Sequence, residues 1–190
     1  MARTRLFGTD GIRDIAGRGN LTPEQVVRTG KAIGYLIKNK PELFADLTGT
    51  VEPEQCLVLT RDTRASGHMI ESAICAGLLA SGIDVVRAGV LPTPVCSFLT
   101  KELECAAGIV VSASHNPFQY NGIKVFDSRG FKISANVEDQ IEELVRDAAK
   151  VDALISEQVG TLDEGGDPAE LYIDDTVSRV IDALDLRDIK

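Results

Sequence analysis

The chain has 190 residues, of which 44% are hydrophobic and 26% charged, and its formal net charge is −9. This composition is typical of a soluble globular protein with one domain, or one domain and part of a second. The acidic balance and the absence of Trp argue against a nucleic-acid partner, and no apolar run is long enough to predict a membrane span.

The acidic charge is concentrated at the end of the chain. Residues 1–150 carry 18 acidic and 17 basic side chains, whereas residues 151–190 carry 11 acidic and 3 basic ones. We therefore expect a main domain over 1–150, followed over 151–190 by an acidic linker and a connector helix that lead to a second domain absent from this sequence.

The cysteines and the N-terminus indicate the cellular compartment. Four cysteines stand in apolar contexts without C-x-x-C spacing, which favours buried, reduced thiols over a zinc site; they are Cys56, Cys75, Cys96 and Cys105. Residues 1–7 are polar and basic and lack the apolar stretch of a signal peptide. A cytoplasmic location is the simplest expectation.

The first elements along the chain are a hairpin and a helix. Short apolar pieces flank a Gly-Thr-Asp-Gly turn at residues 8–11, which predicts the hairpin. Thr22 is a suitable N-cap with Pro23 in the first turn. The buried face of this helix is predicted to comprise Val26, Ile33, Leu36 and Ile37, and residues 41–54 are predicted to form a loop.

The next segments alternate between strand and helix patterns. The predicted strands are 56–60, 84–87 and 107–111, and the predicted helices are 69–81 and 93–103. Strand, helix, strand implies a parallel crossover. A hairpin over 122–126 and 130–133, a closing helix over 137–149 and a connector helix over 168–184 complete a three-layer α/β/α fold with a mixed, mostly parallel sheet.

A polar loop at 112–119 follows the third predicted strand, at the sheet edge where open α/β folds bind ligands. Ser114 would expose its hydroxyl there, with His115 and Asn116 beside it and Pro117 fixing the exit. Spacing alone also allows a purely structural turn, since adjacent Ser and His do not form a hydrolase dyad.

Four cationic side chains fall in predicted loops or at strand ends: Arg13, Arg61, Arg64 and Lys124. Singly, each is an ordinary solvated charge, but together they suit an anionic substrate. The turn at 8–11 could also present backbone N–H groups to an anion. Lys124, at the start of a strand, could transfer a proton.

Five motifs occur in order along the chain: Phe7-Gly8-Thr9-Asp10-Gly11-Ile12-Arg13, Arg61-Asp62-Thr63-Arg64, Gly89-Val90-Leu91-Pro92-Thr93-Pro94, Ser112-Ala113-Ser114-His115-Asn116-Pro117 and Asn121-Gly122-Ile123-Lys124. Together they resemble the first domain of the α-D-phosphohexomutases. The opening looks most like that of the phosphoglucosamine mutases, with the phosphomannomutase/phosphoglucomutase group next.

The resemblance implies an isomerase that moves a phosphoryl group through a phosphoserine and a sugar bisphosphate. Ser114 would be that phosphoserine, and an oxygen of its phosphate would also bind Mg²⁺. The other catalytic residues would be Arg13, Lys124 and His115, and substrate would be bound by Thr9, Asp10, Gly11, Arg13, Asn116 and Lys124. The implied partners are a hexose or hexosamine phosphate and the remaining domains of the enzyme.

Two departures from the family pattern alter this expectation. Asp14 stands where the family usually has Gly, which would loosen the turn after Arg13. The Asp-Gly-Asp metal loop and the sugar-binding domains are not in this sequence, so the isolated chain should be inactive or nearly so. The alternative is a non-catalytic phosphate-binding or partner-binding domain on the same scaffold, for which pairing with a second copy would be one way to cover the exposed interdomain face.

Overall fold

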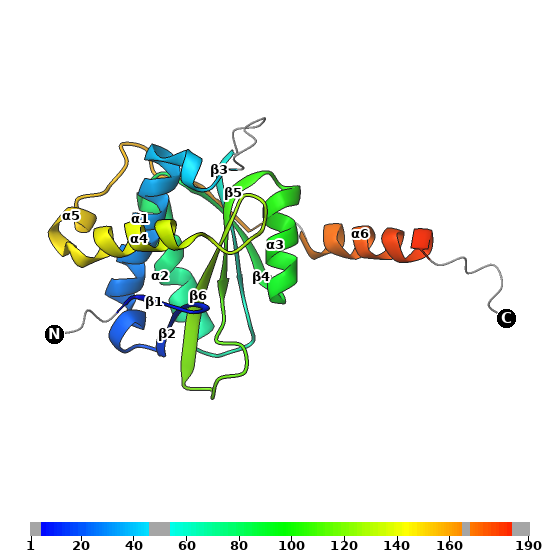
Figure 1. Ribbon diagram of the computed structural model, residues 1–190, viewed down its shortest axis with the longest axis horizontal. Helices are drawn as coiled ribbons and strands as arrows, with labels where there is room; N and C mark the ends of the chain where they lie inside the picture. The colour runs from blue at the N-terminus through cyan, green and yellow to red at the C-terminus, as the bar shows by residue number, and fades with distance from the viewer. Residues whose placement is uncertain (1–4, 46–53, 165–167, 184–190) are drawn as a thin grey trace.

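The computed structural model describes residues 5–45, 54–164 and 168–183. These residues form a seven-stranded sheet covered on both faces by helices, which confirms the predicted three-layer α/β/α architecture (Figure 1). The predicted loop at 41–54 lies partly outside the described residues, as does the end of the connector from Leu184 onward.

The sheet is parallel in its centre and antiparallel on one side. Its order is β1-β2-β6-β5-β3-β4-β7. Strands β5, β3, β4 and β7 pair in parallel, while β1, β2 and β6 join antiparallel beside β5. Their bounds are β1 Phe7–Gly8, β2 Gly11–Ile15, β3 Glu54–Arg61, β4 Asp84–Val90, β5 Cys105–Val111, β6 Tyr120–Asp127 and β7 Leu162–Asp163.

Side chains along each strand point alternately to the two faces of the sheet, and helices cover both faces. On one face, Leu57 and Leu59 of β3 pack with helices α1, α2 and α4, whereas Val58 faces helix α3 on the other. The bounds are α1 Pro23–Asn39, α2 Gly67–Ala80, α3 Thr93–Glu102, α4 Ala135–Arg146 and α5 Ala148–Asp152, with short 3₁₀ turns at Gly19–Leu21 and Pro41–Leu43. Thr22 caps α1 as predicted, accepting a hydrogen bond from the Gln25 N–H.

The predicted closing helix over 137–149 is two helices, because Asp147 interrupts it. The Asp147 side chain accepts a hydrogen bond from the Lys150 N–H and so caps α5. The segment after α5 returns along the domain, where the Gly160 N–H donates to the Leu79 carbonyl, and β7 then pairs with β4.

The predicted connector helix is present as α6, Pro168–Ala183, which projects away from the sheet (Figure 1). Tyr172 contacts Phe98 of α3 edge to face, with ring centroids 5.3 Å apart. Ile173, Val177 and Ile181 remain exposed along α6. None of the described helices is both long and apolar enough to cross a membrane.

The prediction that all four cysteines are reduced thiols is wrong for two of them. Cys56 and Cys105 form a disulfide with a Cα–Cα distance of 4.9 Å. They lie near the starts of β3 and β5, which are neighbours in the sheet. Only Cys75 and Cys96 are free, and both are buried. Burial raises the pKa of Cys96 to about 12, so this thiol stays protonated.

Candidate functional site

The candidate site lies at the carboxyl end of β5, beside β6, with β2 as the next strand of the sheet. Lys124 of β6 stands opposite Val110 of β5, and Arg13 of β2 stands opposite Gly122 of β6. The loop that carries Ser114 leaves β5 directly after Val111. The register of three strands therefore brings motifs from the two ends of the domain to one sheet edge.

Ser114 is exposed at a strained bend of this loop. Its φ is +54°, in the left-handed region that few residues other than glycine adopt. The Ser112 hydroxyl oxygen accepts a hydrogen bond from the Ser114 N–H at 3.0 Å. Such backbone strain persists only where surrounding contacts hold it, and it is common at functional positions.

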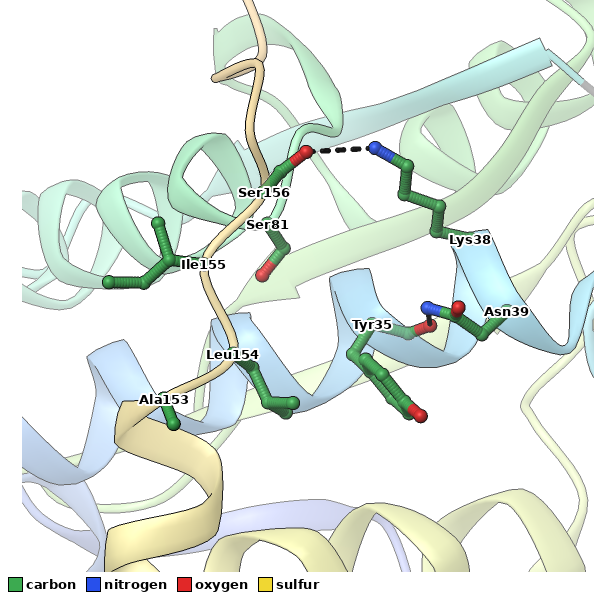
Figure 2. A pocket seen from close by; sticks show the side chains of 8 residues that line it. All are labelled: Tyr35, Lys38, Asn39, Ser81, Ala153, Leu154, Ile155 and Ser156. Carbon is green, nitrogen blue, oxygen red and sulfur yellow. Dashed lines mark hydrogen bonds between the residues drawn. The ribbon is translucent and has the colours of Figure 1, made fainter.

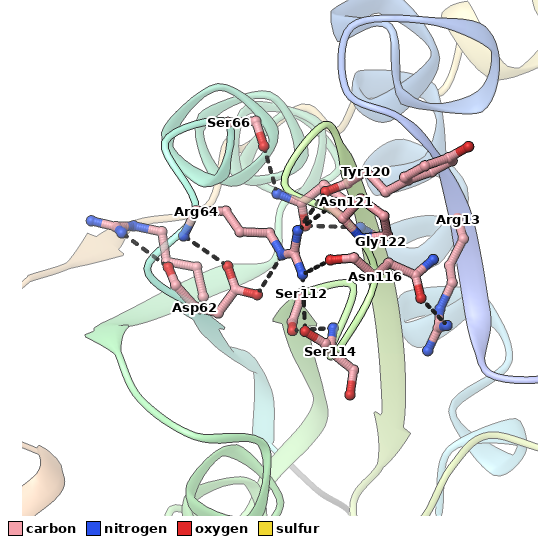
Figure 3. A network of polar contacts seen from close by, with 12 residues as sticks. Arg13, Asp62, Arg64, Ser66, Ser112, Ser114, Asn116, Tyr120, Asn121 and Gly122 are labelled. Carbon is pink, nitrogen blue, oxygen red and sulfur yellow. Dashed lines mark hydrogen bonds and ion pairs between the residues drawn. The ribbon is translucent and has the colours of Figure 1, made fainter.

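Arg13 and Lys124 share the carboxylate of Asp10, and Asn116 joins this group through Arg13. Asp10 Oδ2 lies 2.5 Å from Arg13 Nη2 and 3.5 Å from Lys124 Nζ. Arg13 Nη1 also donates to Asn116 Oδ1 at 3.4 Å (Figure 3). Arg13 Nε is buried without a partner in the described part of the chain. Two cations thus share one exposed carboxylate, an arrangement in which an incoming anion can replace that carboxylate as their partner.

The turn that supplies Asp10 is fixed at both ends. The Thr9 carbonyl accepts a hydrogen bond from Lys132 Nζ at 2.9 Å. Gly11 has φ +91° and packs directly against β6, where no side chain fits. A small pocket of about 40 Å³ adjoins the turn, and Asp10, Gly11 and Lys124 are among the residues that line it.

His115 follows Ser114 and is exposed. Its catalytic role stays a prediction. Asn116 is half-buried, and its side chain turns toward Arg13 (Figure 3). Asn116 therefore links the Ser114 loop to β2, a connection that the sequence motif does not reveal.

Arg61 and Arg64 were expected to suit an anionic substrate, but both have internal partners. Arg61 Nε forms an ion pair with the buried carboxylate of Glu71 at 3.2 Å. Arg64 directs all of its N–H groups to the Asp62 carboxylate and to backbone carbonyls. An arginine in such a position can donate hydrogen bonds to backbone carbonyls as readily as it binds a ligand, and sequence position alone does not distinguish the two.

Asp14 does not loosen the turn after Arg13. Its carboxylate accepts hydrogen bonds from the backbone N–H groups of Ile15 and Asn20 at 2.8 and 2.9 Å. The departure from the family pattern is therefore a local stabilising feature, since it satisfies two donors of an irregular segment.

The described residues do not by themselves form a magnesium site. Within the described ranges, no cluster of three or more His, Cys, Asp or Glu side chains is arranged to hold a metal ion. A phosphate on Ser114 would add one oxygen ligand, whereas Mg²⁺ requires about six.

A larger pocket, of about 260 Å³, lies between the C-terminal half of α1 and residues 153–156 (Figure 2). Lys38 Nζ spans it to donate to Ser156 Oγ at 2.9 Å. Ser81, also in its lining, precedes β4 and so stands at the amino edge of the parallel strands. The pocket is therefore at the opposite edge from Ser114 and is separate from the candidate site.

Together, the fold and the site define an α/β/α domain in which the Ser114 loop follows β5 and its Asn116 contacts Arg13, which shares Asp10 with Lys124. The chain belongs to the phosphoglucomutase/phosphomannomutase family, because residues 4–152 match alpha/beta/alpha domain I of that family.

Two similar proteins are named phosphoglucosamine mutases. The chain is 51% identical over 143 residues to the phosphoglucosamine mutase of Bdellovibrio bacteriovorus, covering 75% of this chain and 30% of that protein. It is 44% identical over 190 residues to the phosphoglucosamine mutase of Paraburkholderia xenovorans, covering all of this chain and 40% of that protein. The chain thus spans well under half the length of these relatives.

A solved structure agrees with this fold. The putative phosphomannomutase from Thermus thermophilus superposes with a TM-score of 0.67 at 29% identity, covering 98% of this chain and 38% of that one.

Proposed function

We propose that the chain is the phosphoserine-bearing domain of a phosphohexomutase, an isomerase that interconverts the 6-phosphate and 1-phosphate of a sugar. The names of the relatives favour a hexosamine phosphate as substrate. The phosphomannomutase/phosphoglucomutase class of hexose phosphates is the alternative, supported by the solved neighbour.

The observation that carries this proposal is the position of Ser114. Ser114 is exposed on a strained bend of the loop whose Asn116 accepts a hydrogen bond from Arg13, and Arg13 shares the Asp10 carboxylate with Lys124. A phosphoryl group needs a positioned nucleophile and cations that neutralise its oxygens more than it needs elaborate covalent chemistry.

The proposed reaction balances as two phosphoryl transfers. In the first, a sugar hydroxyl oxygen attacks the phosphorus on Ser114; the new P–O bond forms as the Ser114 Oγ–P bond breaks, giving a sugar bisphosphate. In the second, Ser114 Oγ attacks the other phosphate of that bisphosphate and the sugar oxygen leaves. In each transfer Lys124 is proposed to accept the proton of the attacking hydroxyl group and to return a proton to the leaving oxygen, and Arg13 to bind the phosphoryl group as it moves.

The complete activity is proposed for an enzyme that contains this domain together with others. Mg²⁺ would neutralise phosphate charge, with the Ser114 phosphate as one ligand and the remaining ligands outside the described residues. We expect the 190-residue chain alone to show no mutase turnover. A cytoplasmic location remains part of the proposal, although the Cys56–Cys105 disulfide removes the reduced-thiol argument for it. Pairing of two copies through the exposed interdomain face belongs to the alternative in which the chain acts on its own.

Transfer to Ser114 can be tested on the chain itself. Incubation with ³²P-labelled glucosamine or glucose 1,6-bisphosphate should place label on the wild-type chain, and peptide mapping should locate it at Ser114. Ser114→Ala should remain unlabelled, while Thr63→Ala, which removes an exposed hydroxyl from a neighbouring loop, should be labelled normally. Label that persists in Ser114→Ala would refute the assignment. Phosphate binding without any label would favour the non-catalytic alternative.

A further inference from the structure

Arg64 makes an unusually complete set of contacts with the Ser114 loop. A guanidinium has five N–H donors, and in Arg64 all five are used (Figure 3). Four of them reach backbone carbonyls of the turn that carries Ser114: those of Ser114 at 2.9 Å, Asn116 at 2.7 Å, Pro117 at 2.9 Å and Tyr120 at 3.1 Å.

Other hydrogen bonds also restrain the loop: the Ser114 N–H donates to Ser112 Oγ, Arg13 donates to Asn116 Oδ1, and the Ala16 N–H donates to the Gln119 carbonyl. Backbone hydrogen bonds join Asn116 to Ala113 and Tyr120 to Pro117. Neither of them involves the carbonyl of Ser114, which instead accepts a hydrogen bond from Arg64. The side chain of Ser114 points away from the guanidinium, so Arg64 holds the backbone of the nucleophile and leaves its hydroxyl accessible (Figure 3).

Arg64 is itself held rigidly. Asp62 Oδ2 accepts from Arg64 Nε at 3.1 Å, and Asp62 Oδ1 accepts from the Arg64 backbone N–H at 3.0 Å. The Asp62 N–H donates to the carbonyl of Val111, the last residue of β5. The side chain of Arg64 is only 13% exposed. The guanidinium is thus anchored to the ends of two neighbouring strands.

We propose that Arg64 is a positioning residue that sets the left-handed backbone of Ser114 and thereby the direction of its hydroxyl. This inference rests on the proposed function, in which Ser114 accepts a phosphoryl group. The Asp62 carboxylate neutralises the charge of Arg64, so Arg64 orders the loop without competing with Arg13 and Lys124 for the phosphate. Misplacing a reacting group by about 1 Å can lower a rate about 100-fold.

The test compares Arg64→Lys, Arg64→Ala and the wild-type chain. Arg28→Ala is the matched control, because Arg28 also makes two side-chain hydrogen bonds, to Asp152, at a remote surface position. We expect both Arg64 variants to accept label from the sugar bisphosphate about 100-fold more slowly, because one ammonium group cannot reach four carbonyls. Arg28→Ala should be labelled at the wild-type rate.

Two further measurements separate positioning from general destabilisation. Guanidinium chloride, far below denaturing concentrations, should partly restore labelling of Arg64→Ala but not of Arg64→Lys. Amide hydrogen exchange should rise in residues 112–120 and remain unchanged in α1 and α2. If Arg64→Ala does not fold, the labelling rate and the hydrogen exchange are measured on Arg64→Lys.

The outcomes distinguish this inference from the proposed function. A labelled wild-type chain with normal labelling of Arg64→Lys would overturn the positioning role alone. Slow labelling with exchange raised equally throughout the domain would also overturn it, in favour of global destabilisation. An unlabelled wild-type chain would overturn phosphoryl transfer to Ser114 by this chain, and with it the role of Arg64.

Discussion

Gly11 lies so close to Ile123 that a methyl group on its Cα would stand 2.3 Å from the Ile123 carbonyl oxygen. This contact joins the turn that carries Asp10 to the strand that carries Lys124. Gly11→Ala should lower the free energy of unfolding by about 2 kcal/mol or more, since it adds a backbone clash to an unfavourable φ of +91°.

The control for this change is Gly17→Ala. Gly17 also has a positive φ, +77°, but a Cβ there would meet nothing within 4 Å. Gly17→Ala should therefore lower the free energy of unfolding only by the cost of placing a side chain at positive φ, about 1 kcal/mol. Urea unfolding measures both, and equal losses for the two variants would contradict the importance of the contact with Ile123.

Asp10 should weaken anion binding in the free chain, because it occupies both Arg13 and Lys124. Asp10→Asn is expected to raise the affinity for inorganic phosphate up to about 5-fold, since exposed ion pairs contribute up to about 1 kcal/mol. Titration calorimetry at low salt measures this effect. Asp139→Asn, which removes an exposed carboxylate bound to Arg5, should leave the affinity unchanged. Weaker binding in Asp10→Asn would instead show that Asp10 helps to hold the anion.

The disulfide should contribute strongly to stability, because Cys56 and Cys105 are 49 residues apart. The chain-entropy relation for such a loop gives about 4 kcal/mol. Urea unfolding with and without reductant should show this loss, and in the double variant Cys56→Ser, Cys105→Ser the reductant should have no effect. The denatured, unreduced chain should titrate two thiols, Cys75 and Cys96; four thiols would contradict the pairing.

The ion pair of Arg28 with Asp152 should make stability depend on acid pH. The hydrogen bond from Arg28 lowers the pKa of Asp152 below its ordinary value. The pair therefore stabilises the fold above about pH 4, the ordinary pKa of Asp, and this contribution is lost as the pH falls toward the lowered value. Urea midpoints of Asp152→Asn should decline less than those of the wild type below about pH 4. Glu143→Gln, at an exposed position, should decline like the wild type.

The order of strands and helices could be predicted because each element carries its own local pattern. Thr22 and Pro23 mark the start of α1, and its apolar spacing gives the buried face. Local pattern fails where a single side chain interrupts a helix, as Asp147 does between α4 and α5. The success with α1 and the failure at Asp147 have the same cause: sequence periodicity describes only residues that are close together in the chain.

Pairings between distant residues could not be predicted in this way. The disulfide depends on β3 and β5 being neighbours, and strand order is not visible in cysteine spacing. Arg64 carried the same sequence signal as Arg13, a cation in a loop, yet its partners are carbonyl oxygens. Carbonyl groups are present at every residue, so no side-chain motif could indicate that use.

The left-handed backbone at position 114 also limits which amino acid can supply the hydroxyl. Threonine has the same oxygen nucleophile, but its branched Cβ makes a φ of +54° far more costly than it is for serine. A threonine there would favour a relaxed loop and move its oxygen away from the position that Ser114 Oγ takes. The shape of the loop, independently of phosphoryl chemistry, therefore selects serine over threonine at this position.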